Sequence, residues 1–326
     1  MEHSIERVRA IAVSHDTDAK TAEISFLGVK IGLSMPMEVY GLFLDKYRSV
    51  LPPISDTVSC RNPDFFINYS FGEPSLRLVD NTAHIVSKAK NSQAAIDVML
   101  AASKFLEREL NRNGIYSLHA SAIALGRDGT IFLGQQGSGK TTVALSCSFL
   151  DPEVKLISGS RVFVKEDKIV GSIPSIDLRF GSVISELSTE LQDSKNSTII
   201  QNQQVWDQRV LLRPEDLHIN TNAEYPIDIR RLVLVKKLPK ELLAVRNSID
   251  RDSFLVRVYD ALYAFSEHIP QYVLGSKIPY PDIFGNGMRQ SRIQFGERLL
   301  GSKQPIYLEG RLAEISTYVV RELLRT

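Results

Sequence analysis

The stretch GQQGSGKT, residues 134–141, decides the fold that we expect for this chain of 326 residues. It satisfies the pattern G-x-x-x-x-G-K-S/T, follows a strand-like apolar run at 130–133 and precedes a helical run at 142–150. Glycines let backbone N–H groups turn toward phosphate oxygens, and the start of a helix adds partial positive charge. The stretch therefore predicts a loop that binds the phosphates of a nucleotide.

Two side chains of this loop carry the expected chemistry. Lys140 should reach the β- and γ-phosphates and the Thr141 hydroxyl should ligate magnesium, so ATP with Mg²⁺ is the expected ligand. The alternative for this stretch is a glycine-rich turn with an exposed lysine. The residues predicted to contact the nucleotide are Gly134, Gln135, Gln136, Gly137, Ser138, Gly139, Lys140, Thr141 and Thr142.

Charge and composition narrow the class of protein. Thirty-nine basic and 38 acidic residues leave a formal charge of +1, which predicts neither nucleic acid nor an anionic membrane surface as a partner. The first residues lack the apolar core of a secretory signal and no apolar run approaches about 18 residues, so we expect a cytoplasmic protein without a membrane span. Cys60 and Cys147 lie far apart in the sequence, which favours buried thiols over a disulfide or a reactive cysteine.

Three parts are expected along the chain. Apolar segments separated by turns, beginning with residues 5–14, predict a small β-rich N-terminal domain over residues 1–90. An amphipathic helix over 91–114 should lead into an α/β nucleotide-binding domain that ends at residue 239. Residues 240–326 should be mainly helical and pack on the nucleotide domain. Within them, PYPDIFGNGMRQ (279–290) predicts an inter-helix loop, with a substrate lid as the alternative.

Short strands joined by tight turns are expected around the phosphate loop. Strand-like residues at 116–125 and 130–133 enclose a hairpin turn with glycines, and residues 156–164 and 167–172 form a second strand pair. Residues 230–237 predict another buried strand. The polar stretch 185–208 predicts a mobile excursion from the domain.

The surroundings of the loop add a histidine. His119 lies fifteen residues before Gly134, within LHASAI, on a predicted strand that ends in the hairpin feeding the loop. This arrangement resembles the HPr kinase/phosphorylase family, which has a phosphoenolpyruvate-carboxykinase-like nucleotide core and a histidine on the strand before its phosphate loop. The resemblance implies that His119 orients or polarises the active-site network. Without the resemblance, His119 is interpreted as a core histidine whose hydrogen bonds are satisfied.

Further residues match the same family downstream. The sequence IDLR at 176–179, followed by FG, resembles the family's IEIRG signature, which implies that Asp177 helps to hold magnesium and that Arg179 lies near the phosphates. Taken alone, an Asp-x-Arg on an alternating strand is interpreted as a solvated ion pair. Arg230 and Arg231 resemble an arginine-bearing strand near that family's active site. Arg179 or Arg231 would then stabilise the transferred charge, because the planar guanidinium donates to several phosphate oxygens at once.

One departure from the family concerns the general base. The family has a strand that ends in paired aspartates, and here Gly159 and Ser160 stand at that place. Neither side chain acts as a base near neutral pH. Three explanations remain: another carboxylate such as Asp177 or Asp207 serves as the base, the acceptor hydroxyl is activated without a side-chain base, or the chain no longer transfers phosphate.

The sequence thus predicts an α/β fold with three parts: a P-loop nucleotide-binding domain of the HPr kinase/PEPCK-like type with a mixed sheet, a small β-rich N-terminal domain and a helical C-terminal part. The function that we expect is ATP-dependent phosphorylation of a hydroxyl on a small molecule or a peptide. A non-catalytic nucleotide-binding regulatory module and a slow nucleotide hydrolase are the alternatives. Because the paired aspartates are missing, a carrier protein is a less favoured acceptor. Homo-oligomerisation is compatible with the sequence.

Overall fold

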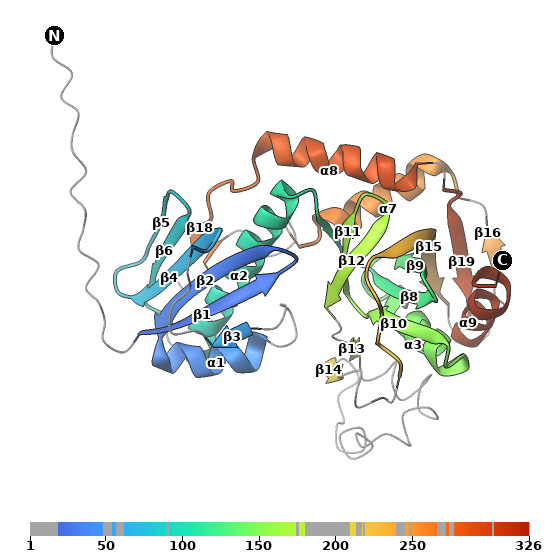
Figure 1. Ribbon diagram of the computed structural model, residues 1–326, viewed down its shortest axis with the longest axis horizontal. Coiled ribbons are helices and arrows are strands. Elements are labelled where there is room, and N and C mark those ends of the chain that lie inside the picture. The colour runs from blue at the N-terminus through green and yellow to red at the C-terminus, as the bar shows by residue number, and fades with distance from the viewer. Residues whose placement is uncertain are drawn as a thin grey trace, which may run out of the picture.

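The computed structural model consists of two units, each built on a mixed β-sheet with helices packed against it (Figure 1). The expected mixed α/β class is therefore confirmed. The structure describes residues 19–47, 54–56, 62–89, 91–173, 176–179, 209–212, 217, 219–238, 245–247, 249–265, 272–273, 277–301 and 303–325. The expected segments at 5–14 and 185–208, together with Cys60 and Asp207, lie outside these residues.

The N-terminal unit is a sheet covered on one face by two helices. Its strands are β1 (Ala19–Phe26), β2 (Val29–Pro36), β3 (Ile54–Asp56), β4 (Phe65–Phe71), β5 (Ser75–Val79) and β6 (Thr82–Ser87), in the order β3-β1-β2-β4-β6-β5. Pairing is parallel from β2 through β4 to β6 and antiparallel elsewhere. Alternate residues of β4 are buried, and helices α1 (Met37–Tyr47) and α2 (Asn91–Arg112) supply the apolar faces that cover them.

Helix α2 belongs to this unit rather than to the nucleotide domain. Its buried face includes Val98 and Phe105, and the Phe105 ring stacks on Phe65 of β4 with ring centroids 3.9 Å apart. The expected domain boundary at residue 90 therefore falls on the wrong side of this helix, and the chain leaves the unit near Gly114 instead. Helical periodicity indicated an apolar face correctly but did not indicate which sheet would cover that face.

The second unit contains the phosphate loop. Its main strands are β7 (Tyr116–Leu118), β8 (Ser121–Leu125), β9 (Asp128–Leu133), β10 (Val154–Ser158), β11 (Arg161–Lys165), β12 (Lys168–Ile173), β15 (Ile227–Lys237), β16 (Val245–Asn247) and β19 (Ile306–Gly310). The order is β10-β8-β9-β15-β12-β11-β7, and β19 pairs with the second half of β15 and with β16. Strands β9, β15 and β19 run parallel, so their carboxyl ends lie at one edge of the sheet.

Helices cover both faces of this sheet. One face carries the Phe132 side chain of β9. It is buried by helix α3 (Lys140–Leu150), helix α9 (Leu312–Tyr318) and the π-helical turn η2 (Val319–Leu323). Helices α7 (Arg251–Tyr263) and α8 (Gly285–Leu300) bury the opposite face, on which the neighbouring Ile131 and Leu133 point. The consecutive apolar residues from Ile131 to Leu133 are typical of a parallel strand that is buried on both faces.

The C-terminal part differs from the expected helical region. It contains β19, which is a strand of the nucleotide-domain sheet, as well as helices that pack on that domain. The predicted loop at 279–290 contains the end of β18 (Ile278–Pro279), which pairs with β17 (Tyr272–Val273), and the start of α8. Tyr280 is only 8% exposed and packs in the core of the N-terminal unit, which identifies this segment as an anchor rather than a lid.

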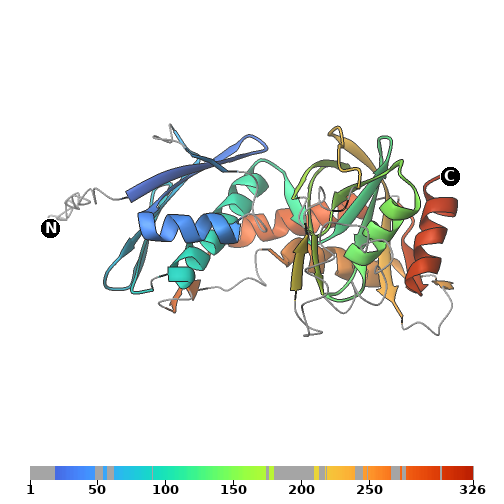
Figure 2. The ribbon, with the colours of Figure 1, turned by 90° about the horizontal axis from the view of Figure 1, so that it is seen from below.

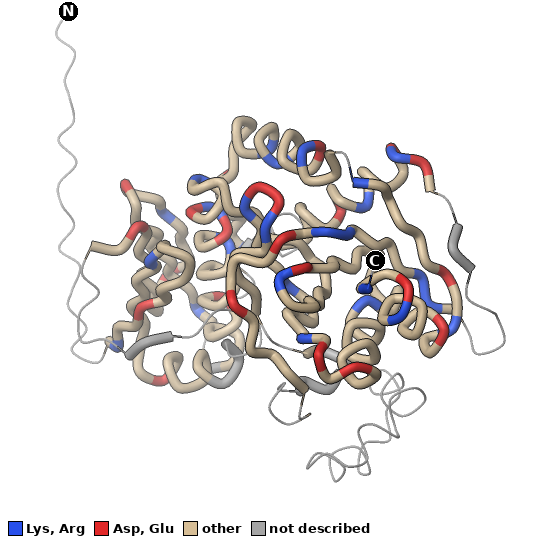
Figure 3. The backbone as a smooth tube through the Cα atoms, turned by 45° about the vertical axis from the view of Figure 1, so that its right-hand side comes forward, with Lys and Arg blue, Asp and Glu red and all other residues tan. Residues whose placement is uncertain are grey.

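Helix α8 extends from this anchor back to the nucleotide domain, so the C-terminal part contacts both units (Figures 1 and 2). Lys and Arg are interspersed with Asp and Glu along the described chain (Figure 3). No helix of the described residues combines the length and apolar character needed to cross a membrane.

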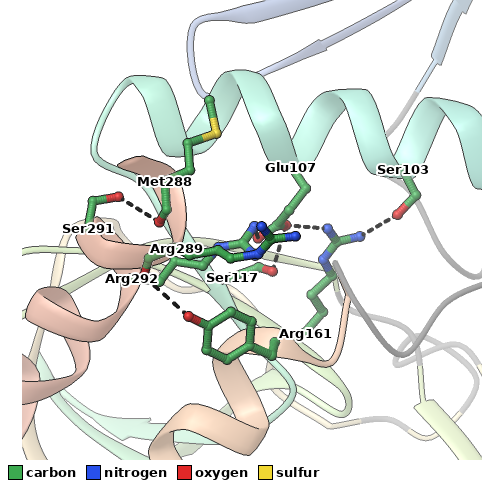
Figure 4. A network of polar contacts seen from close by, with 9 residues as sticks. Ser103, Glu107, Ser117, Arg161, Met288, Arg289, Ser291 and Arg292 are labelled. Atoms are coloured by element: carbon green, nitrogen blue, oxygen red, sulfur yellow. Dashed lines mark hydrogen bonds and ion pairs between the residues drawn. The ribbon is translucent and has the colours of Figure 1, made fainter. Parts of the chain in front are cut away.

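A buried charge cluster joins the two units (Figure 4). Glu107 of α2 accepts hydrogen bonds on Oε2 from Arg161 Nη2 at 2.7 Å and from Ser117 Oγ at 2.6 Å. Arg292 Nη2 of α8 lies 3.7 Å from the other carboxylate oxygen, and Arg161 Nη1 donates to Ser103 Oγ at 3.2 Å. Burial lowers the pKa of Arg161, and the charge of Glu107 opposes this shift. A single carboxylate thus holds two arginines that are each 1% exposed.

Removal of that carboxylate charge should destabilise the fold. We expect Glu107→Gln to lower the free energy of unfolding by about 3–5 kcal/mol, because the substitution removes the buried negative charge that Arg161 and Arg292 contact. Urea denaturation measures this change. Glu73→Gln is the matched control, since Glu73 pairs with Lys88 at the surface and should change stability by about 0–1 kcal/mol. Equal effects of the two substitutions would contradict the role of the cluster.

Candidate functional site

The predicted phosphate loop connects β9 to α3 at the carboxyl-terminal edge of the sheet. Two of its glycines are required by geometry. Gly134 has a φ of 145°, and a Cβ at this position would lie 2.5 Å from Ser138 Oγ and 2.7 Å from the carbonyl oxygen of Val235. Gly139 has a φ of 94°, and a Cβ there would lie 2.8 Å from Cβ of Lys237. Residues with side chains would therefore distort the loop.

The end of β15 supports the loop from the side. The backbone N–H of Lys237 donates to the carbonyl of Ser138 at 2.8 Å, and the N–H of Ser138 donates to the carbonyl of Gln135 at 3.1 Å. Sequence analysis did not associate Lys237 with the site. The signal was available only in the strand pairing, because Leu234 lies in register with Leu133 and the next residues of β15 must then run beside the loop.

Lys140 lies along the loop rather than toward solvent. Its ammonium group donates to the carbonyls of Gly134 at 2.9 Å and Gln135 at 3.1 Å, and the residue is 6% exposed. Burial lowers the pKa of Lys140 to about 8. The phosphates of a nucleotide would offer charged acceptors in place of these neutral carbonyls, and charge-assisted hydrogen bonds are stronger. The exposed lysine of the alternative interpretation is not observed.

The Thr141 hydroxyl faces the turn at 159–160. Thr141 Oγ1 donates to the carbonyl oxygen of Gly159 at 2.7 Å. Ser121 Oγ, at the start of β8, donates to the same oxygen at 2.7 Å and lies 3.3 Å from Thr141 Oγ1. Gly159 and Ser160 therefore lie directly beside the loop. Sequence analysis did not identify Ser121 as a site residue.

His119 occupies the bend between β7 and β8, not the interior of a strand. Its backbone N–H donates to the carbonyl of Ala261 at 2.9 Å, and its ring lies 5.5 Å from the Phe265 ring. Leu118 pairs with Val162, so the antiparallel register places His119 next to Arg161 and to the turn at 159–160. The structure thus brings the half-buried His119 close to the turn that contacts Thr141, separated from Ser121 by one residue.

The backbone of Asp177 and Arg179 lies near α3. Both residues belong to β13 (Ile176–Arg179), which pairs with β14 (Arg209–Leu212). Ile176 is buried in the same core as Val143 of α3, so β13 packs beside α3. The side chains of Asp177 and Arg179 lie outside the described part of the chain, so their roles at the metal and the phosphates stay predictions.

Arg231 is separated from the loop. It lies in register with Thr130, four residues before Gly134 and therefore about 13 Å from the start of the loop. Its neighbour Arg230 pairs with Asp128 at 2.9 Å on the surface, at the opposite edge of the sheet. Because β15 runs parallel to β9, the end of β15 reaches the phosphate edge and its start does not. The structure therefore does not bring Arg231 into the charge-stabilising position that the resemblance implied.

The described residues include oxygen ligands that suit magnesium but no cluster of carboxylates. Among them, no group of three His, Cys, Asp or Glu side chains is arranged to hold a metal ion. The hydroxyl oxygen of Thr141 suits a hard cation that also takes oxygens from phosphates and water. Cys147 is fully buried in α3, where burial raises the pKa of its thiol to about 12, in agreement with the expected buried thiol.

Comparisons with known proteins add no family assignment. Neither a scan against protein-family models nor a search of curated proteins found a match to this chain. The class of site is therefore argued from its geometry, which is a glycine-rich loop between a parallel strand and a helix, with a buried lysine folded onto the loop.

Nucleotide binding should depend on the protonation of Lys140. Because the pKa of about 8 in the free protein should rise beside phosphates, binding above pH 8 requires uptake of a proton. We expect the dissociation constant of an ATP analogue to be constant near pH 7 and to increase by up to about tenfold per pH unit above pH 8. Calorimetric titration at saturating Mg²⁺ tests this dependence. Lys140→Gln should bind more weakly at every pH and show no such increase, whereas a constant wild-type affinity above pH 8 would contradict the role of Lys140.

Proposed function

We propose that this protein binds ATP with Mg²⁺ on residues 134–142 and transfers phosphate to a hydroxyl of a small molecule or a peptide. The observation that carries the proposal is the position of Lys140, which is buried against the carbonyls of a loop whose glycines have positive φ angles. Such a loop presents backbone N–H groups and a helix start to an anion. We further propose that the second unit has the HPr kinase/PEPCK-like fold that the sequence resembles.

The residues of the site would divide the work between binding and positioning. Lys140 and the loop amides would hold the phosphates, and Thr141 would offer its hydroxyl oxygen to the metal. Bound Mg²⁺ would neutralise part of the phosphate charge. His119 would orient the groups beside the turn at 159–160, and Arg179 would donate to the transferred phosphate. Phosphoryl transfer relies mainly on position and charge, so the neutral turn is compatible with it.

A non-catalytic nucleotide-binding regulatory module is the second candidate. The specific observation in its favour is that Gly159 and Ser160 lie beside Thr141 and supply no carboxylate to an acceptor hydroxyl. In that function, occupancy of the loop would control association with a partner. A slow nucleotide hydrolase is the intermediate case, in which water replaces the acceptor.

One experiment separates these functions. We expect purified protein, labelled ATP and a cell extract to yield a labelled acceptor, and we expect Lys140→Ala to abolish the labelling. The variant should also lose about 1.5–3 kcal/mol of nucleotide binding, because it removes a charge-assisted contact but little core packing. Release of phosphate without a labelled acceptor would identify a hydrolase. Binding without either product would identify the regulatory module, and an unchanged dissociation constant in Lys140→Ala would refute the phosphate loop.

The role of Asp177 has a separate test. We expect Asp177→Asn to raise the Mg²⁺ concentration needed for half-maximal nucleotide binding, because it removes a negative oxygen ligand or a charge near the metal. Asp167→Asn is the matched control, since Asp167 lies in the exposed turn between β11 and β12, away from the loop. Identical Mg²⁺ titrations of the wild type and Asp177→Asn would favour the solvated ion pair with Arg179.

A further inference from the structure

We infer that Ser121 and the backbone carbonyl of Gly159 position the Thr141 hydroxyl for the metal ion of the bound nucleotide. The inference rests on the nucleotide binding proposed above and adds two groups to that site. The group that orients the threonine is a neutral backbone oxygen.

The hydrogen bonds at Gly159 fix the direction of the Thr141 proton. A carbonyl oxygen has two lone pairs, and this one accepts from Thr141 Oγ1 and from Ser121 Oγ, each at 2.7 Å. The two hydroxyl oxygens lie 3.3 Å apart, which is longer than the usual hydroxyl–hydroxyl bond of about 2.5–3.0 Å. Ser121 Oγ also donates to Thr141 Oγ1 at this longer distance, but the carbonyl oxygen is the nearer acceptor for both hydroxyls. The lone pairs of Thr141 Oγ1 are then available to a cation.

The turn that carries this carbonyl is held rigidly from its other side. The Ser158 hydroxyl accepts from the backbone N–H of Ser160 at 3.2 Å and from the N–H of Arg161 at 2.9 Å. Its own proton is directed to the carbonyls of Arg161 and Ile173, at 2.9 Å and 3.1 Å. The bond from the Ser160 N–H fixes the Gly159–Ser160 peptide, and the direction of the Gly159 carbonyl with it.

Ser121 acts through this carbonyl rather than on the metal. The residue is fully buried on β8, whereas Thr141 is half-buried at the start of α3. A cation that arrives with phosphates in the loop reaches Thr141 but does not reach a hydroxyl without exposed surface. Ser121 is therefore a positioning residue. Without its hydroxyl, one lone pair of the carbonyl loses its partner, and the direction of the Thr141 hydroxyl is less restricted.

The test measures how strongly Mg²⁺ enhances nucleotide affinity. The enhancement is the dissociation constant of an ATP analogue in EDTA divided by that in saturating Mg²⁺. We expect Ser121→Ala to reduce the enhancement about tenfold, as is typical when a group that orients a metal ligand is removed. Its affinity in EDTA should stay within about twofold of the wild type, because the phosphate contacts of Lys140 and the loop amides are intact. A purely structural defect would weaken both affinities.

Controls assign the effect to Thr141. Thr141→Val should lose the enhancement, and adding Ser121→Ala to it should cause no further loss, because the two residues act as one unit. Ser148→Ala is the matched control on the same helix: its buried hydroxyl donates to the carbonyl of Ala144, away from the loop, and the enhancement should be unchanged. If Ser121→Ala does not fold, Ser121→Cys preserves the side-chain size with a weaker donor and should also reduce the enhancement.

The outcomes separate this inference from the proposed function. A wild-type protein that binds no nucleotide refutes both. A wild-type protein that binds nucleotide without enhancement by Mg²⁺ refutes the inference and the role of Mg²⁺ in the proposed function, but not nucleotide binding. An enhancement that survives Ser121→Ala, or a further loss when Ser121→Ala is added to Thr141→Val, refutes the inference alone.

Discussion

The turn from Ser158 to Arg161 is the constraint on which the rest of the site depends. On one side its Gly159 carbonyl accepts the hydroxyls of Ser121 and Thr141, which ties β8 and α3 together at the edge of the sheet. On the other side Arg161 turns into the interior and binds Glu107 of α2. The same few residues therefore connect the phosphate loop to the N-terminal unit. Loss of one partner of such a buried ion pair is costly, because it leaves an uncompensated charge in the interior.

The electrostatics of the site follow from this arrangement. Positive charge is concentrated on a buried Lys140 whose pKa is lowered by burial, and the group facing Thr141 is a neutral carbonyl. A carboxylate at the same place would repel the phosphates unless a metal offset it. The turn at 159–160 thus places no negative charge beside Thr141.

The C-terminal part explains how the two units stay together. Tyr280 is inserted in the core of the N-terminal unit, α8 returns along the nucleotide domain, and β19 completes its sheet beside β15. Arg292 of α8 also contacts Glu107, so the anchor and the charge cluster act on the same helix of the N-terminal unit. Nucleotide domain and N-terminal unit are therefore joined by apolar burial and by charge.

The sequence by itself determined the glycine-rich loop at 134–141, the flanking strand and helix, and the mixed α/β class. These features rest on local backbone geometry, because glycines with positive φ angles and a helix start are encoded within a few consecutive residues. The tertiary structure alone decided that α2 covers the N-terminal sheet, that Arg231 lies away from the loop, and that Ser121 and the Gly159 carbonyl meet Thr141. Each of these outcomes depends on strand order and register between distant segments, and periodicity within one segment shows which face is apolar without showing which distant segment will pack against it.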